Sequence, residues 1–519
     1  MKQILLQYDV SRGRIPRIET IENQISILQG HGLTGIVFYL ESVVQGLGLP
    51  TAGCGNTPLT VDMLCRLRDF CKSRNLEFMP IFQILGHQGN LLALKEMTCY
   101  AEEAPPHGEF QIDNAELTER LQNYVRALAP CFHSPYLHLG GDEATRIGLG
   151  HSAAICRKKG FENALADYLN RWNSFIRSLG KTMVIYGDFL IHYPYLGRLL
   201  DSNIAVCNWN YGTLMEKYEL ENHNFAMHET ICAGRENFVS GNCMAEYILP
   251  SFSRLKTNTE TWMGLAKRSH AERFIISDWG SDDNYNPFVL TVAGSLYILA
   301  RLKDRFESLE SWSECVTEVC WGKPHPGLKD CLKRLFGVQQ NTDFFPEKLN
   351  FMGPIFPTLL FGDPDSRDVI RLTACLDRTA IGNLLAFSKK LYADILIIQP
   401  VEAEYPDFID ELQGVSRRLL MLALRMMLLL EHTWHSGAIW VQEADVADQR
   451  KFLCEFETLA EQDIAWYSRR WNEDNLVGCQ ERVKQLSRQM IQSTARAFHC
   501  PDNVLLHYPP QINEGESYV

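Results

Sequence analysis

Short apolar runs that end in polar or charged residues recur through the first part of the chain. Stretches with apolar residues at helical spacing lie between these runs. This alternation is typical of a parallel sheet whose strands are joined by helices. The eight strand-like runs cover residues 4–9, 35–41, 77–83, 136–143, 183–188, 204–209, 225–232 and 274–279.

Eight parallel strands are the number that closes a (β/α)8 barrel. Local signals support the intervening helices: Thr60 is expected to cap a helix over 61–74, and Asn114 to cap one that reaches residue 128. Residues 162–179 carry apolar side chains at helical spacing. The sequence therefore predicts an α/β fold, with a (β/α)8 TIM barrel as a catalytic domain over residues 1–320.

Long amphipathic patterns replace the strand-like runs after a stretch rich in Pro and Gly at residues 321–327. We therefore expect an α-helical C-terminal domain over residues 321–519. Its Leu- and Met-rich segment 419–430 is expected to bury one face against the barrel or against a second copy, so a homodimer is one of two compatible assemblies. The patterns predict four helices, at 369–391, 405–432, 444–472 and 478–498.

The composition is that of a folded protein that can bury a large core, since 46% of residues are hydrophobic and 22% are charged. A net charge of -13 argues against nucleic-acid binding as the main function. Arg425 interrupts the longest apolar run, which is shorter than the roughly 20 residues that span a membrane. The N-terminus lacks a signal-peptide core, and the 16 cysteines are scattered as expected of reduced thiols. These features predict a cytoplasmic protein that does not bind membranes.

Polar side chains gather where the predicted strands end, which is the edge that carries the active site in such barrels. Carboxylates, an arginine, a histidine and aromatic rings at one mouth suit a sugar: carboxylates accept hydrogen bonds from hydroxyls, and aromatic faces stack on C–H groups. Any single one of these residues is equally compatible with a solvated loop, whereas the whole set is much less so. The strand-end residues are Asp9, Arg12, Glu41, Gln83, His87, Asp142, Glu143, Asp188, Trp209, Tyr211, Trp279, Asp282 and Asp283.

The strongest local motif is His-Leu-Gly-Gly-Asp-Glu at residues 138–143, where a strand ends in two glycines and two carboxylates. Like charges this close raise the pKa of one group, so that an acid can stay protonated near neutral pH. Glu143, the longer side chain, is the predicted general acid. Neighbours on an extended backbone point in different directions, so Asp142 is badly placed as a nucleophile about 5 Å from that acid. A 2-acetamido group of the substrate is then an attractive nucleophile, with Asp142 orienting its amide.

This motif resembles the H-x-G-G-D-E signature of the glycoside hydrolase family 20 β-N-acetylhexosaminidases. The early first strand resembles the short, cytoplasmic hexosaminidase D type, which lacks the extra N-terminal domain of many relatives. The resemblance extends over most of the predicted barrel. It implies exo-hydrolysis of terminal β-linked GlcNAc or GalNAc with retention, through an oxazolinium intermediate, with Asp142 orienting the acetamido group and Glu143 as general acid/base. The implied partner is an oligosaccharide or glycoconjugate, and no cofactor or metal is expected.

The resemblance also implies contacts around this pair. The segment 9–12, Asp-Val-Ser-Arg, resembles the first-strand segment whose arginine binds sugar hydroxyls; that arginine is Arg12, with Arg14 as a competitor. His87, after Gly86, would lie near the 3-hydroxyl. Trp209 and Trp279 would form a wall and the floor of the pocket. The predicted binding set is completed by Tyr211 for the acetamido oxygen, Asp282 or Asp283 for the 4- or 6-hydroxyl, and Glu41, His138 and Asp188.

The chain departs from the family pattern in two places. Residues 279–281 read Trp-Gly-Ser where the family usually shows W-x-E, which leaves the preference for GlcNAc or GalNAc open. Gly187 stands where an aromatic residue is common, so one wall of the pocket is expected to be more open.

Two other functions compete with this prediction. One is a sugar-binding protein that kept the pocket and lost turnover, against which the intact Asp142–Glu143 pair argues. The other is a metal-dependent hydrolase with His87, His138 and the acids as ligands, although the spacing is not that of a common metal motif.

Overall fold

A computed structural model describes the chain up to residue 465, apart from residues 13–14, 55–57, 105–106, 213–218, 244–250, 281–287, 304, 306–307, 342, 345–358, 361–368, 370–371, 438–450, 453, 457 and 464. Asp282, Asp283 and Arg14 therefore lie outside the described residues. The predicted helix at 478–498 and much of the one at 444–472 also lie outside them.

Eight parallel strands form a closed barrel in chain order, which confirms the predicted (β/α)8 fold. The barrel closes where β1 pairs with β8, with Gln3 opposite Arg273 and Tyr8 opposite Asp278. The strands are β1 Gln3–Asp9, β2 Gly35–Tyr39, β3 Glu77–Ile81, β4 Tyr136–His138, β5 Thr182–Tyr186, β6 Ala205–Trp209, β7 Asn237–Asn242 and β8 Arg273–Asp278.

The strands read as continuous apolar runs because helices cover their outer faces while side chains fill the interior. β2 shows this well, since all of its residues are buried. Inside the barrel, Leu5, Val37, Met79 and Phe238 belong to one buried cluster. Trp209 and Trp279 pack against this cluster from the strand ends, where the candidate site lies.

The predicted seventh strand is wrong. Residues 225–232 belong to helix α9, Glu219–Cys232, and the strand is β7. In α9 the buried residues Phe225, His228 and Ile231 recur every third position, which is helical spacing. β7 reads Asn-Phe-Val-Ser-Gly-Asn. Because of its polar residues it does not form an apolar run, although all of them are buried. A hydrogen bond of 2.7 Å between the Ser240 and Ser277 hydroxyls offsets part of that burial.

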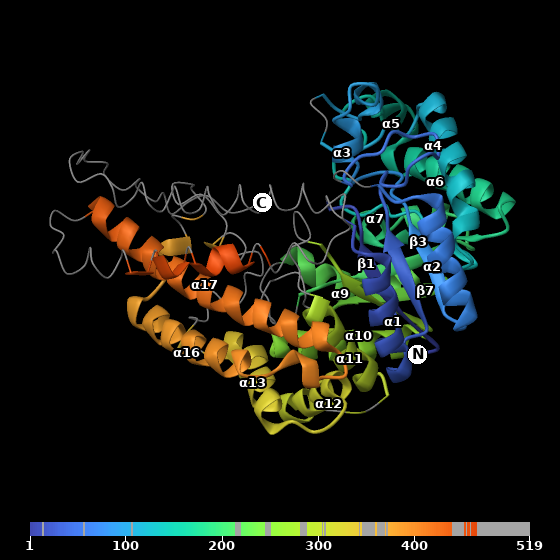
Figure 1. The fold of residues 1–519 in the computed structure, drawn as a ribbon. Coiled ribbons are helices and arrows are strands. Elements are labelled where there is room, and N and C mark those ends of the chain that lie inside the picture. Colours follow the sequence, from blue (N-terminus) through green and yellow to red (C-terminus); the bar gives the residue numbers. More distant parts are fainter. Residues whose placement is uncertain are drawn as a thin grey trace. The chain divides into compact units, whose positions relative to one another are not determined.

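The helices of this unit lie around the outside of the strands (Figure 1). Both predicted caps are confirmed: Thr60 Oγ1 accepts from Met63 N at 3.2 Å at the start of α2, and Asn114 Oδ1 accepts from Leu117 N at 2.9 Å at the start of α4. The helices are α1 Ile18–His31, α2 Val61–Ser73, α3 Gly89–Leu92, α4 Ala115–Leu128, α5 Ala153–Lys159, α6 Phe161–Ser178, α7 Asp188–His192, α8 Leu196–Leu199, α10 Phe252–Ser269, α11 Phe288–Arg301 and α12 Leu309–Trp321.

A second compact unit begins at Pro326. It contains α13 Pro326–Gly337, α16 Arg378–Leu396 and α17 Pro406–Gly437, and α16 and α17 pack side by side (Figure 1). The predicted helix start at residue 369 is wrong for α16, because a turn at 374–375 intervenes and Asp377 caps the helix by accepting from Ala380 N at 2.8 Å. The proposed division into domains 1–320 and 321–519 stays a prediction.

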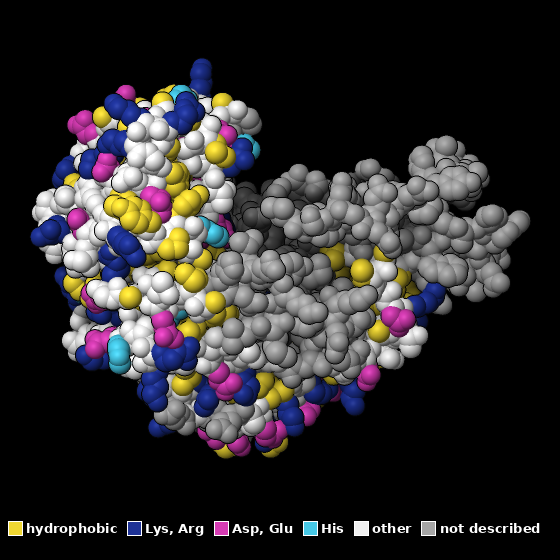
Figure 2. All heavy atoms as spheres, turned by 180° about the vertical axis from the view of Figure 1, so that it is seen from behind, with side chains coloured by type: hydrophobic (Ala, Val, Ile, Leu, Met, Phe, Trp, Pro, Cys, Tyr) yellow, Lys and Arg dark blue, Asp and Glu magenta, His cyan; other side chains and the backbone are white. Residues whose placement is uncertain are grey.

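Basic and acidic side chains are interspersed on the described face of the barrel in Figure 2. Among the described helices, none combines the length and the apolar character required to cross a membrane.

Asn258 of α10 fastens the ends of β6 and β7 together. Its fully buried amide donates to the carbonyls of Asn210 at 2.9 Å and Gly212 at 2.8 Å, and its oxygen accepts from Asn242 N at 3.3 Å. One side chain from a helix thus links the ends of the two strands that carry Trp209 and Ser240.

We predict that Asn258→Ala lowers the free energy of unfolding by about 3 kcal/mol, because it leaves buried backbone groups without partners. The urea midpoint measures the loss. Asn123→Ala, which removes an exposed amide from α4, is the control and is expected to change stability by less than about 0.5 kcal/mol. Equal midpoints for the two variants would contradict this role of Asn258.

Candidate active site

The two adjacent carboxylates follow β4 on a backbone that turns sharply. Gly140 and Gly141 have φ of 66° and 95°, values in the left-handed region that glycine adopts without a side-chain clash. A Cβ at residue 140 would lie 1.8 Å from Oε1 of Gln83, so space as well as conformation requires glycine there. Glu143 also has positive φ, at 51°, which is uncommon for a residue with a side chain.

Asp142 is buried and held by two side chains from the segment after β3. Its Oδ1 accepts from Gln83 Nε2 at 2.6 Å, and its Oδ2 forms an ion pair with His87 Nε2 at 3.3 Å. Gln83 also accepts from Gly141 N at 2.9 Å, so one amide fixes both the carboxylate and the turn. Burial acts to raise the pKa of Asp142, but His87 and Gln83 outweigh burial and hold that pKa below its usual value.

Glu143 is placed differently, with a side chain that is 59% exposed. Its Oε2 lies 3.5 Å from His87 Nε2, and its backbone N–H donates to Asp188 Oδ2 at 3.2 Å. Partial loss of water contact and the negative charge of Asp142 raise the pKa of Glu143 above its usual value. The pKa values of the two neighbouring carboxyl groups are therefore shifted in opposite directions, so the two groups are not equivalent.

His87 lies between the two carboxylates. Burial of its ring acts to lower its pKa, but the hydrogen bond and charge of Asp142, with the charge of Glu143, raise the pKa to about 9. The imidazole is then a cation at neutral pH, and its charge stabilises the ionised form of Asp142.

Arg12 projects from the end of β1 into the same group. Its Nε donates to Asp9 Oδ2 at 2.9 Å, and its Nη1 lies 3.9 Å from Glu41 Oε1. Asp9 also accepts from the backbone and hydroxyl of Ser11, at 3.0 and 2.7 Å. Burial raises the pKa of Glu41 to about 7, although the charge of Arg12 opposes the shift.

Aromatic rings from three strand ends form a connected wall. Trp209 and Tyr211 are stacked with ring centroids 5.1 Å apart, and Tyr211 meets Trp279 edge-on at 6.2 Å. Trp279 in turn meets Tyr39 edge-on at 4.9 Å. Asp188 fixes one end of the wall by accepting from the Trp209 indole N–H at 2.7 Å. Burial and the charge of Asp142 raise the pKa of Asp188 to about 8.

His138 differs from the other predicted residues because it is fully buried inside the barrel. Its Nδ1 accepts from Gly140 N at 3.0 Å, and its ring lies 4.2 Å from that of Tyr186. Burial lowers its pKa to about 3, so the ring is neutral. In this position His138 holds the turn that leads to Asp142 and has no surface exposed for a sugar.

The structure thus joins most of the predicted residues through direct contacts at the carboxyl ends of the strands. The joined residues are Arg12, Glu41, His87, Asp142, Glu143, Asp188, Trp209, Tyr211 and Trp279. Asp9 and Gln83 were named among the strand-end residues without a role for either, and Tyr39 was not named, although Tyr39 lies near the end of an apolar run. Among the described residues, no group of three or more His, Cys, Asp or Glu side chains is arranged to hold a metal ion.

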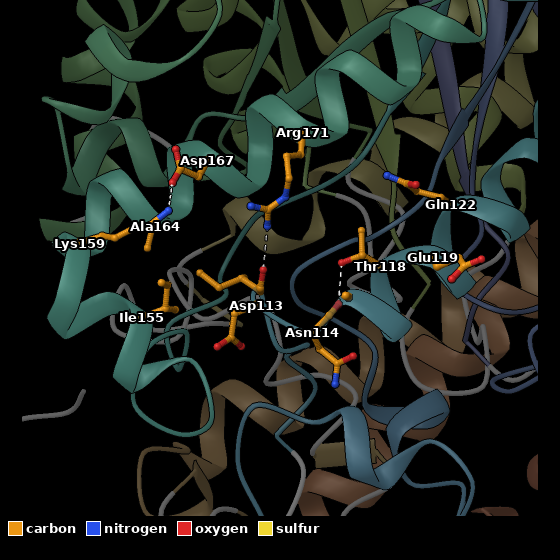
Figure 3. Close-up of a pocket in the computed structure, with 12 residues that line it drawn as sticks. Asp113, Asn114, Thr118, Glu119, Gln122, Ile155, Lys159, Ala164, Asp167 and Arg171 are labelled. Atoms are coloured by element: carbon orange, nitrogen blue, oxygen red, sulfur yellow. Dashed lines mark hydrogen bonds and ion pairs between the residues drawn. The ribbon is translucent and has the colours of Figure 1, made fainter.

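A hollow of about 410 Å³ lies elsewhere, between α4, α5 and α6 (Figure 3). Its charged lining residues are already paired in part: Lys159 contacts Asp167 at 2.5 Å, and Arg171 donates to the Ile112 carbonyl at 3.2 Å. None of its lining residues belongs to the candidate site.

We predict that NMR titration of His87 gives a pKa of about 9, and that Asp142→Asn returns it toward the ordinary value of 6.5. Because the folded state raises this pKa, proton binding at His87 stabilises the fold. The contribution is complete below pH 6.5 and disappears as pH rises toward 9. His133, which precedes β4 at the opposite end of the strand, is the internal control and should not respond. An unchanged His87 titration in the variant would refute the pairing.

Comparison with known proteins found a matching family model and a distant relative. Residues 56–236 match the model of the glycosyl hydrolase family 20 catalytic domain. A beta-hexosaminidase of Porphyromonas gingivalis is 22% identical over 167 residues, a match that covers 28% of this chain and 21% of that relative.

Solved structures of two proteins are similar in fold. A Flavobacterium johnsoniae chitobiase is 12% identical with a TM-score of 0.49, over 87% of this chain and 74% of that one. A β-N-acetylhexosaminidase from Bacteroides fragilis is 14% identical with a TM-score of 0.43, over 57% of this chain and 65% of that one. The family match agrees with the resemblance that the motif predicted, since the matched residues 56–236 include Asp142 and Glu143.

Proposed function

We propose that this protein is an exo-acting β-N-acetylhexosaminidase that removes terminal GlcNAc or GalNAc with retention, using the 2-acetamido group of the substrate as nucleophile. The observation that carries the proposal is the pair Asp142 and Glu143, whose pKa values shift in opposite directions within one site. A protonated acid and an anion are the two groups that this reaction needs.

In the first step, ionised Asp142 accepts the amide N–H of the acetamido group and turns the amide oxygen toward the anomeric carbon. That oxygen forms a bond to the carbon while the glycosidic C–O bond breaks and Glu143 gives its proton to the departing oxygen. The products of this step are the free alcohol and an oxazolinium ring, whose positive charge faces the Asp142 carboxylate.

In the second step, Glu143 accepts a proton from a water molecule as that water attacks the anomeric carbon on the face that the alcohol left. The oxazolinium ring opens, the acetamido group is restored, and the sugar keeps its β configuration. Glu143 ends protonated and ready for the next cycle.

The surrounding residues suit the sugar. In this proposal Trp209 forms the wall beside the acetamido group, Tyr211 donates to the acetamido oxygen, and Trp279 forms the floor on which the sugar ring stacks. Arg12 and Glu41 offer a donor and an acceptor for hydroxyls, and Asp9 holds the guanidinium of Arg12 in place.

We also propose that the natural substrates are oligosaccharides or glycoconjugates that end in N-acetylhexosamine, and that the protein works in the cytoplasm. The motif and the family match support the substrate class. The distribution of cysteines supports a reducing compartment. Of the two packing arrangements predicted for the Leu- and Met-rich segment, burial within one chain is the one found: residues 419–429 of α17 are buried in the single chain, so no homodimer through this face is proposed.

We predict that Glu143→Gln lowers kcat for an aryl N-acetyl-β-glucosaminide, and lowers it more, by about 10²- to 10⁴-fold, when the leaving group is a poorly acidic alcohol. The reason is that only a poor leaving group needs the proton. Asp142→Asn is expected to cost about 10²- to 10³-fold with either leaving group, since it removes charge stabilisation. Initial rates on both substrates, and on the matching GalNAc glycosides, provide the measurement.

Glu119→Gln is the matched control, because Glu119 lies on α4 in the hollow of Figure 3 and outside the site. It should keep the wild-type rate. Wild-type rates in both active-site variants would exclude the proposed roles. Binding of GlcNAc by calorimetry without any product release from the wild-type protein would instead indicate a sugar-binding protein.

We further predict that the aryl β-glucoside, which has a 2-hydroxyl in place of the acetamido group, is not measurably hydrolysed. This follows because the nucleophile belongs to the substrate. Proton NMR of the first product formed from the acetamido substrate should show the β-anomer before mutarotation. Comparable rates on the glucoside, or release of the α-anomer, would rule out substrate assistance.

A further inference from the structure

Asp188 makes two hydrogen bonds that connect two parts of the candidate site. It is the first residue of α7, directly after β5. Its Oδ1 accepts from the indole Nε1 of Trp209 at 2.7 Å, and its Oδ2 accepts from the backbone N–H of Glu143 at 3.2 Å. The two donors lie 21 and 45 residues away in sequence, on β6 and after β4.

The bond to Glu143 acts on a strained part of the backbone. Glu143 has φ of 51°, and a left-handed conformation costs a residue with a side chain roughly 1 kcal/mol or more. Such a conformation persists when its surroundings determine it from several sides. Gln83 holds the turn at Gly141 N from the β3 side, and Asp188 holds it at Glu143 N from the β5 side.

The bond to Trp209 acts on the aromatic wall. The indole is partly buried, packs against the barrel's apolar cluster and stacks on Tyr211 with ring centroids 5.1 Å apart. A hydrogen bond from Nε1 selects one orientation of the ring. Each oxygen of one carboxyl group is thus committed to a different functional element.

We infer that Asp188 is a positioning residue that sets the Glu143 turn and the Trp209 ring in a fixed relation, so that a sugar stacked on the ring meets the acid at the required distance. The inference rests on the proposed function and replaces a direct contact between Asp188 and the substrate. The ionised carboxylate suits this role, because both of its oxygens accept hydrogen bonds, whereas an amide has one accepting oxygen. The bonds from Trp209 and Glu143 favour that ionised form and oppose the effect of burial on its pKa.

The test compares Asp188→Asn in two backgrounds, wild-type and Trp209→Phe. In the wild-type background the amide presents its oxygen to only one of the two N–H donors and its NH2 group to the other, so kcat/KM on an aryl N-acetyl-β-glucosaminide should fall by about 10- to 100-fold, mainly in kcat. In the Trp209→Phe background the indole N–H is absent and the amide oxygen is free to accept from Glu143. There the same substitution should cost less than about threefold.

The competing role gives a different result. If Asp188 bound a sugar hydroxyl directly, Asp188→Asn would cost the same factor in both backgrounds and would mainly raise KM, which would overturn the inference. A loss confined to thermal stability, with kcat unchanged, would also overturn it. If Asp188→Asn alone fails to fold, the inference requires the double variant Asp188→Asn/Trp209→Phe to fold. In that variant the amide oxygen accepts from Glu143 N and no indole N–H is left without an acceptor.

A second measurement does not depend on activity. The Trp209 indole N–H signal in a ¹⁵N-tryptophan spectrum is assigned by its loss in Trp209→Phe. In Asp188→Ala its exchange with solvent should be at least about tenfold faster than in the wild type, because the acceptor is gone. An unchanged exchange rate would overturn the inference, whether or not the wild-type protein shows hydrolysis. Faster exchange in a protein that shows no hydrolysis would count against the proposed function alone.

Discussion

The adjacency of Asp142 and Glu143 is the constraint on which the rest of the site depends, because two neighbouring carboxylates in a half-buried setting cannot both stay charged at low cost. The protein treats them differently. Asp142 receives a hydrogen bond from Gln83 and the charge of His87, while Glu143 keeps contact with water and no comparably short bond to its side chain. The pKa values of two similar groups are thereby shifted in opposite directions, which is the kind of difference that acid-assisted bond cleavage requires.

That separation requires a backbone that bends within four residues, and the barrel provides it. The register pairs Ile81 with His138 and His138 with Val184, so the segments after β3, β4 and β5 emerge at one edge. Gln83 and Asp188 can then hold the turn from both sides. The barrel therefore contributes to the chemistry by bringing together residues that are distant in sequence.

The sequence predicted much of this because the relevant signals are local. Seven of the eight strands coincide with apolar runs that can be recognised in the sequence alone. Thr60 and Asn114 cap helices by accepting from backbone groups three positions away. β7 was not predicted because several of its residues are polar and their burial depends on a partner distant in sequence, as in the hydrogen bond between Ser240 and Ser277. The motif at 138–143 likewise identified the carboxylate pair. The roles of Gln83 and Asp188 depend on contacts between residues 21 to 59 positions apart, which periodicity and spacing do not encode.

The polar residues at the ends of the strands fix the arrangement of the site, and their burial costs stability. Buried carboxyl groups gain little net free energy even when paired, so their value lies in the arrangement that they fix. Asp9 illustrates this: its oxygens accept from Ser11, Arg12 and the backbone N–H of Gly280, the last at 3.3 Å. The Arg12 guanidinium is therefore oriented before a sugar arrives, and less side-chain freedom is lost on binding. The same reasoning applies to Trp209 under Asp188, so the site is organised in advance by acids that need not touch the substrate.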